Sequence, residues 1–193
     1  MVLRLAMSAM AMTVRIRPYR LDDAPALYEA ATESIQHVYP WLAWCHPGYT
    51  MAEAVAWLQH TVKAWRSGAE YNFAIVDADD RMLGGCGLNG IGGSHRTANL
   101  GYWLRASALG KGHAVEAVRQ LVAFAFSETQ LERLEIVASV SNGASRRVAE
   151  RSGAIPEGIA HGRLRVHGVQ HDAAIYAFVR FVHGSAASHP DKP

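Results

Sequence analysis

A short glycine-rich stretch, Gly110-Lys111-Gly112-His113-Ala114, has the residue types of an anion-binding turn. It stands between a segment with strand character and a segment with helical periodicity. Unpaired backbone N–H groups and the positive end of the helix dipole would converge there on a phosphate or a diphosphate. The spacing matches neither a P-loop nor a dinucleotide-binding fingerprint, and a plain tight turn before a helix has the same pattern.

Three polar residues further along the chain could bind or protonate a ligand. Asn142, Ser145 and Arg146 lie at the start of a short helical segment that ends before Gly153. An amide and a guanidinium donate hydrogen bonds, and a hydroxyl can also transfer a proton. Asparagine and serine are also common helix caps when they stand at the start of a helix. Both a ligand role and a capping role are therefore open for Asn142 and Ser145.

Glu33 and His37 form a second candidate pair. They lie four residues apart in an expected helix, so they share one of its faces. A carboxylate and an imidazole placed in this way could flank an acceptor amine and bind the substrate. A solvated helix end is the simpler interpretation of the same spacing.

Composition limits the possible function classes. The chain has 193 residues, half of them hydrophobic, and a net charge of +2 from scattered basic and acidic residues. These values favour one globular domain without a nucleic-acid partner. No apolar run approaches the ~20 residues that span a bilayer, so we expect no membrane insertion. Cys45 and Cys86 lack the spacing of a zinc site or of a disulfide framework, which predicts no metal and a cytoplasmic location.

The two ends of the chain differ from the rest. Residues 1–12 combine one arginine with a short apolar stretch, and we interpret them as a mobile leader rather than a secretory signal. Residues 184–193 are small, polar and proline-containing, which is typical of a flexible tail. The folded domain is therefore expected over residues 13–183.

Hydrophobic periodicity predicts the elements that position these residues. Strands are expected at residues 14–17, 71–77, 82–88, 99–105, 134–140, 158–166 and 173–182, with a loop at 90–94. Helices are expected before residue 38, after Thr50, after the glycine-rich stretch and at residues 145–151. Thr50 and Glu53 form a capping box for the second helix. Its expected apolar face is Met51, Val55, Leu58, Val62 and Trp65. The element order predicts an α/β fold with a mostly antiparallel central sheet of about seven strands, flanking helices and one central β-α-β crossover.

A block of motifs resembles a known enzyme family. The motifs are Asn99-Leu100-Gly101-Tyr102-Trp103-Leu104, then the glycine-rich stretch, then Asn142-Gly143-Ala144-Ser145-Arg146-Arg147-Val148-Ala149-Glu150, then Gly153 and Glu157-Gly158. Together they resemble the GNAT superfamily of N-acetyltransferases, and within it the branch that acetylates the N-terminal alanine or serine of ribosomal proteins. The resemblance implies that acetyl-CoA is the co-substrate.

The resemblance also implies a role for each motif. The pyrophosphate of acetyl-CoA would lie on the amides of residues 110–114, and its pantetheine arm would run beside the strand at 99–105, splayed from the strand at 134–140. A backbone N–H near Trp103, Leu104 or Arg105 would bind the developing oxyanion. Asn142 would hydrogen-bond the pantetheine, and the Ser145 hydroxyl would protonate the leaving thiolate.

The sequence departs from the family pattern at three places. Leu109 replaces a Gln or Arg that contacts phosphate, so Lys111 or Arg146 would substitute for it. Ala149 replaces the tyrosine that protonates the thiolate in many relatives, which leaves Ser145 as the nearest matching donor. Arg163 and Leu164 stand where some relatives have a glutamate base, so no base is assigned and a chain of water molecules would remove the amine proton.

The sequence therefore predicts a cytoplasmic, metal-free N-acetyltransferase that transfers acetyl directly to a protein N-terminal α-amine. Two alternatives stay open. One is an enzyme that acetylates a small-molecule amine such as an aminoglycoside or a polyamine, and the other is a non-catalytic acyl-CoA-binding module. The sequence is compatible with a monomer or a homodimer.

Overall fold

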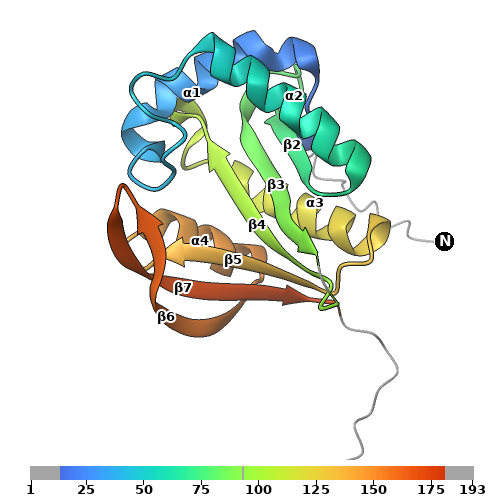
Figure 1. Ribbon diagram of the computed structural model, residues 1–193, viewed down its shortest axis with the longest axis vertical. Coiled ribbons are helices and arrows are strands. Elements are labelled where there is room, and N and C mark those ends of the chain that lie inside the picture. Colours follow the sequence, from blue (N-terminus) through green and yellow to red (C-terminus); the bar gives the residue numbers. More distant parts are fainter. Residues whose placement is uncertain (1–13, 93, 181–193) are drawn as a thin grey trace, which may run out of the picture.

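A seven-stranded sheet with the order β1-β2-β3-β4-β5-β7-β6 runs through the molecule (Figure 1). In the computed structural model, which describes residues 14–92 and 94–180, the strands are β1 (Arg15–Pro18), β2 (Tyr71–Val76), β3 (Met82–Gly92), β4 (Thr97–Leu104), β5 (Arg133–Ser139), β6 (Ile155–Val166) and β7 (Val169–Val179). Neighbouring strands are antiparallel except β4 and β5, which are parallel. The predicted α/β fold with one β-α-β crossover is confirmed. The expected leader 1–12 and tail 184–193 lie outside the described residues.

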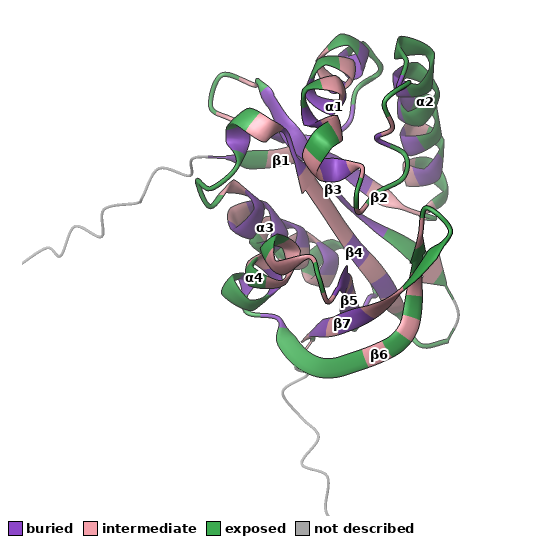
Figure 2. Cartoon of the chain, turned by 90° about the vertical axis from the view of Figure 1, so that its left-hand side faces the viewer, coloured by how far each residue is buried: buried purple, intermediate pink, exposed green. Residues whose placement is uncertain are grey.

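Four α-helices in the described residues cover the two faces of this sheet. Helices α1 (Ala24–Val38) and α2 (Met51–Ser67) lie on one face, and α3 (His113–Glu128) and α4 (Gly143–Ser152) lie on the other (Figures 1 and 2). Short 3-10 turns precede α1 (Leu21–Asp23) and follow β4 (Ala106–Ala108). None of the described helices is long and apolar enough to cross a membrane.

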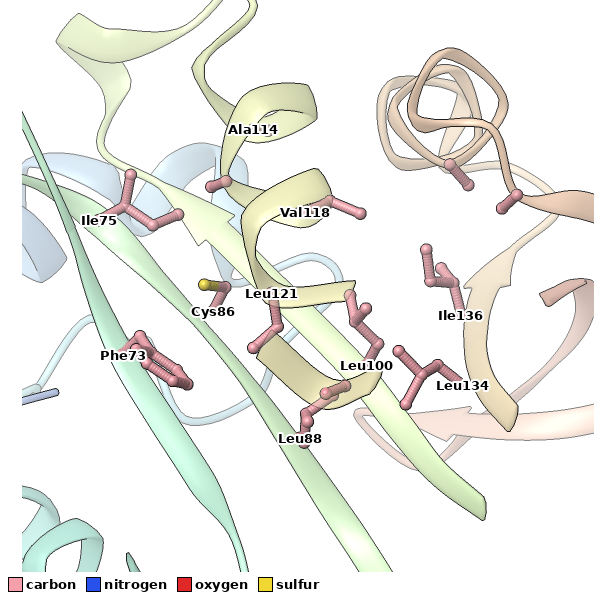
Figure 3. Close-up of a cluster of buried hydrophobic side chains, with 14 of the residues drawn as sticks. Phe73, Ile75, Cys86, Leu88, Leu100, Ala114, Val118, Leu121, Leu134 and Ile136 are labelled. Atoms are coloured by element: carbon pink, nitrogen blue, oxygen red, sulfur yellow. The ribbon is translucent and has the colours of Figure 1, made fainter. Parts of the chain in front are cut away.

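The core between α3 and the sheet follows directly from the two periodicities of the sequence. Alternate residues of the central strands, such as Leu88, Leu100 and Leu134, point toward α3. Val118 and Leu121 of α3, three residues apart, meet them from above (Figure 3). This packing fixes α3, and with it the glycine-rich stretch at its start, above the end of β4.

The start of α2 is predicted correctly, and its buried face is predicted in part, since Leu58 is completely buried and Trp65 packs against the core as expected. Thr50 and Glu53 form the expected capping box, with the Thr50 amide donating to the Glu53 carboxylate at 2.8 Å. Met51 and Val55 are exposed, at 40% and 39%. The buried stripe of α2 is Ala54, Leu58, Thr61 and Ala64. Small residues bring the helix close to its neighbours, so contact distance rather than side-chain hydrophobicity determines which face is buried.

The glycines of β3 lie in a strand that is longer than the sequence predicts. β3 extends to Gly92, so most of the predicted loop at 90–94 is wrong, and residue 93 lies outside the described residues. Gly85 lies inside the strand, where an added Cβ would be 2.2 Å from the Tyr19 hydroxyl and 2.8 Å from the indole nitrogen of Trp103. The absence of a side chain at Gly85 therefore allows Tyr19 and Trp103 to pack over the strand.

Candidate active site

β4 and β5 separate soon after they begin to pair. Residues 97–99 of β4 pair with residues 133–135 of β5, and no pairing is found beyond them although both strands continue (Figure 1). β4 keeps its pairing with β3 to Leu104, and β5 keeps its pairing with β7 to Ser139. The facing edges of β4 and β5 are therefore left without a strand partner. This is the splay that the family resemblance implies.

The backbone of β4 alternates between these two edges. The Arg105 amide donates to the Leu83 carbonyl at 2.8 Å, so odd-numbered residues at this end of β4 bond to β3. The backbone groups of Tyr102 and Leu104 consequently point to the opposite edge, toward the separation from β5. Of the residues expected to bind an oxyanion, Leu104 has its amide directed there, whereas the amides of Trp103 and Arg105 belong to the ladder with β3.

The glycine-rich stretch forms an open turn at the start of α3. Gly110 and Gly112 have φ angles of 75° and 85°, in the left-handed region, and nothing lies within 4 Å of a Cβ added to either. Gly112 is the N-cap of α3, and no side chain caps that end. The Nδ1 atom of His113 is buried and has no hydrogen-bond partner in the described part of the chain. Free helix amides beside an unpartnered polar atom fit an anionic group such as a diphosphate.

The two cations expected to contact phosphate are directed elsewhere. Lys111 Nζ donates to the Ser107 carbonyl at 3.1 Å. Arg146 donates to the Tyr176 hydroxyl and to the Val140 carbonyl, both at 3.2 Å. A phosphate contact by Lys111 or Arg146 therefore requires its side chain to exchange these partners.

Asn142 and Ser145 meet at the start of α4, as predicted, and a tyrosine joins them. The Asn142 side-chain oxygen accepts from the Ser145 amide at 3.1 Å, which makes Asn142 the cap of α4. The Tyr102 hydroxyl donates to the Ser145 carbonyl at 2.8 Å and lies 3.0 Å from the Ser145 hydroxyl. Burial raises the pKa of Tyr102 to about 12, so its hydroxyl stays protonated at neutral pH.

Sequence reasoning missed this role of Tyr102. The signal was the alternation of β4, because Tyr102 shares a strand face with the buried residues Leu100 and Leu104. Ala149, which replaces the tyrosine of many relatives, is completely buried under this face. The Tyr102 hydroxyl is therefore a second hydroxyl beside Ser145, supplied by the strand instead of the helix.

Glu33 is committed to a buried arginine. Its carboxylate accepts from the Arg105 guanidinium and, at 2.7 Å, from the Ser107 amide. Arg105 is 3% exposed and also donates to Glu29 and to the Met82 carbonyl. The hydrogen bonds from Arg105 lower the pKa of Glu33 to about 2. Glu33 therefore joins α1 to the end of β4, and the solvated helix end is not what the structure shows.

His37, one turn after Glu33, reaches the same end of β4. Its Nε2 atom lies 2.9 Å from the Leu104 carbonyl oxygen. Because a carbonyl only accepts hydrogen bonds, Nε2 carries the proton of this bond. Glu33 and His37 thus act on one end of one strand, Glu33 through Arg105 and His37 through Leu104.

The hairpin of β6 and β7 approaches this region from the other side (Figure 1). At its tip, His167 Nε2 lies 2.7 Å from the Tyr39 carbonyl, and the two rings are 4.1 Å apart. Trp44 and Trp103 pack edge to face, with centroids 5.2 Å apart, on the side of the sheet covered by α1. The segment after α1 and the hairpin tip therefore border the end of β4.

Comparison with known proteins assigns the chain to a family. The model of the acetyltransferase (GNAT) domain matches residues 13–155. The chain belongs to the GNAT acetyltransferase family. The predicted enzyme class and the predicted co-substrate, acetyl-CoA, are thereby confirmed. Because the match includes the glycine-rich stretch, Asn142 and Ser145, it covers most of the GNAT site described above.

Individual GNAT relatives cover almost the whole chain. YdaF of Bacillus subtilis (strain 168), whose name proposes a ribosomal N-acetyltransferase, is 30% identical over 86% of this chain and 91% of its own. The structure of Mycobacterium smegmatis RimJ in complex with CoA-disulfide has 26% identity and a TM-score of 0.75, covering 86% of this chain and 81% of that one. RimL, a ribosomal L7/L12 α-N-protein acetyltransferase solved with coenzyme A, has 24% identity and a TM-score of 0.80, covering 88% of this chain and 95% of that one. At this identity the similarity shows that the two proteins share a fold.

The link between Glu33 and Arg105 should make the stability of this GNAT domain depend on pH. Because the pKa of Glu33 is about 2 when folded and 4.5 ordinarily, its ionised form favours the folded state above pH 4.5. That contribution is lost as the pH falls toward 2. We expect the Tm of Glu33→Gln to be lower than the wild-type Tm near pH 7. Below pH 3 the two Tm values should approach each other.

Thermal unfolding across this pH range measures the effect. Glu29→Gln is the control, because Glu29 also bonds Arg105 but its side chain is 67% exposed, and we expect a smaller loss of Tm. If the Tm of Glu33→Gln differs from the wild-type Tm by the same amount at pH 3 and at pH 7, this interpretation is wrong.

Proposed function

We propose that this GNAT enzyme acetylates the N-terminal α-amine of a protein by direct transfer from acetyl-CoA in a ternary complex. The observation that carries the proposal is the separation of β4 from β5 beside the uncapped start of α3. The separated edge of β4 can hydrogen-bond the amides of the pantetheine arm, and the uncapped start of α3 can bind the diphosphate of acetyl-CoA. The acceptor class is supported by YdaF, whose name proposes a ribosomal N-acetyltransferase. Its similarity to this protein extends over 86% of this chain and 91% of its own.

The described residues fit acetyl-CoA along its length. The amides after Gly112, with His113 beside them, would hold the pyrophosphate. The free edge of β4 at Tyr102 would pair with the pantetheine amides, which leaves the Leu104 amide for the acetyl group at the end of that arm. The side-chain NH2 of Asn142 remains available while its oxygen caps α4. Bound there, acetyl-CoA supplies the activated acetyl group.

The protein's own groups then divide the work of the transfer. The Leu104 amide would donate to the acetyl carbonyl oxygen as negative charge develops on it. The Ser145 hydroxyl would donate a proton to the leaving sulfur, directly or through water, by turning its O–H from the Tyr102 oxygen, 3.0 Å away, toward the sulfur. Neither cysteine is needed as a nucleophile, since both are buried and burial raises the pKa of Cys45 to about 11. Two free cysteines also agree with a cytoplasmic location.

An acceptor screen tests the acceptor class. CoA thiol release would be measured with peptides that carry a free N-terminus, with the same peptides blocked at that amine, and with polyamines and aminoglycosides. We expect release with the free peptides and none with the blocked ones. Faster release with a polyamine or an aminoglycoside would contradict the protein acceptor and support the small-molecule alternative.

The glycine turn provides a test of the cofactor site. Gly112→Glu places a carboxylate where the diphosphate is expected, and we predict that acetyl-CoA binding is abolished by charge repulsion. Gly112→Ala is the matched control, because it carries the same cost of a left-handed φ without the charge. Calorimetric titration should show binding by the alanine variant and none by the glutamate variant. Equal affinities would mean that the turn only connects β4 to α3.

The hydroxyl of Ser145 should matter for catalysis but little for folding. Its partner, Tyr102, keeps a hydrogen bond to the Ser145 carbonyl when the hydroxyl is removed, and Asn142 provides the helix cap. We expect Ser145→Ala to lower kcat roughly 10- to 1000-fold, with the Kd of acetyl-CoA and the Tm nearly unchanged.

Steady-state kinetics and a melting curve separate these effects. Ser127→Ala, which removes an exposed hydroxyl from α3, is the control for the loss of a serine hydroxyl. A normal kcat in Ser145→Ala would remove Ser145 from the mechanism, whereas a lowered Tm with a normal kcat would assign it a packing role.

A further inference from the structure

No base is assigned by the sequence, yet the acceptor must lose a proton before it attacks. An N-terminal α-amine has an ordinary pKa near 7.7 to 8.0, so much of it is an ammonium at neutral pH. Arg163 and Leu164 lie on the exposed strand β6 and carry no group that accepts a proton at this pH. The sequence left this proton to a chain of water molecules, and the described residues at the end of β4 are the place to look for a side chain that accepts it.

His37 is positioned at that end by a hydrogen bond to the backbone of Leu104. Its Nε2–H donates to the Leu104 carbonyl, and that carbonyl points to the edge of β4 that faces away from β3. The Leu104 amide points to the same edge, because both backbone groups of a strand residue lie on one side. The imidazole thus lies beside the backbone group that would bind the acetyl oxygen.

The same hydrogen bond determines the protonation of the ring. With the proton on Nε2, the neutral ring has a lone pair on Nδ1. Nδ1 has no hydrogen-bond partner among the residues that the structure describes. A histidine whose tautomer is fixed by one partner and whose other nitrogen is free has the arrangement of a general base.

We propose that His37 is the general base that takes the proton from the acceptor ammonium through Nδ1. This inference rests on the proposed function. The nitrogen–carbon bond forms and the carbon–sulfur bond breaks in the transfer. The ammonium loses two protons overall. One passes through His37 Nδ1 to water, and the other passes through water to the Ser145 oxygen, where it replaces the proton that Ser145 gives to the CoA sulfur.

The other charged or titratable groups of the neighbouring elements are already bonded to partners, which leaves the His37 imidazole as the candidate base. On α1, Glu33 is bound to Arg105 and to the Ser107 amide, and Glu29 is bound to Arg105 as well. At the hairpin tip, the Nε2–H of His167 is bound to the Tyr39 carbonyl. In the first turn of α2, Glu53 accepts from the Thr50 amide and hydroxyl and lies 2.8 Å from the Nε2 atom of His46, which precedes the helix. The carboxylates in this set therefore already have hydrogen-bond partners.

Two substitutions separate a base from a residue that only holds the strand. His37→Gln can keep a donor to the Leu104 carbonyl, because its side-chain NH2 reaches the place of Nε2, but it has no basic nitrogen. His37→Ala loses both. We expect both variants to lower kcat roughly 100- to 1000-fold with a twofold change at most in the Kd of acetyl-CoA. The deficit should shrink as the pH rises and the acceptor loses its proton without help. His60→Gln, on the exposed face of α2, is the matched control.

The result for His37→Gln decides between the two roles. A kcat within a few-fold of wild type in this variant, with the acidic limb of its pH profile intact, would overturn the inference and leave a positioning role. Absence of thiol release from wild type with every amine would instead contradict the proposed function itself.

Histidine nitrogen NMR gives a readout that does not require turnover. Comparison with the His37→Gln spectrum identifies the signals of His37 in the ligand-free protein. We expect a proton on Nε2 and a bare Nδ1 in the neutral ring. A proton on Nδ1 would overturn the inference whatever the kinetics show.

Discussion

The whole site depends on the short pairing between β4 and β5. Parallel neighbours in a sheet normally satisfy one another's backbone groups along their shared length. Here they do so over residues 97–99 and 133–135 and then part. An unpaired strand edge inside a protein costs free energy unless water or a ligand satisfies it. Under the proposed function, the pantetheine arm of acetyl-CoA supplies the amides that satisfy the edge of β4, so the separation of the strands serves to bind the co-substrate.

The rest of the structure holds this separation in place from both sides. On one face, α3 packs on the core of β3, β4 and β5 and delivers its uncapped end to the tip of β4 (Figure 3). On the other face, the buried Arg105 ties the end of β4 to Glu29 and Glu33 of α1. Removing one partner of a buried charge pair is costly, because it leaves the other charge unpaired. The Arg105 side chain thus holds the end of β4, which carries Leu104, against α1, which carries His37, whereas the sequence placed Arg105 among the residues that bind the cofactor.

Periodicity and glycine position predicted most of the architecture, because both are local properties of the sequence. The strand alternation, the start of α3 at the glycine-rich stretch and the stop of α4 at Gly153 all follow from neighbours within a few residues. The partners of Glu33 could not be predicted in this way, since Arg105 lies 72 residues away. The same holds for Tyr102 and Ser145, which are 43 residues apart and meet only when α4 packs over β4. Local patterns place a residue on a face, whereas its hydrogen-bond partner depends on the tertiary fold.

Amide hydrogen exchange followed by NMR, with and without acetyl-CoA, tests the central claim most directly. If the edge of β4 is the pantetheine site, the amides of Tyr102 and Leu104 should become strongly protected on binding. The amides of Trp103 and Arg105, which already bond to β3, should change little. Equal changes at all four amides, or binding without protection of Tyr102 and Leu104, would contradict the account.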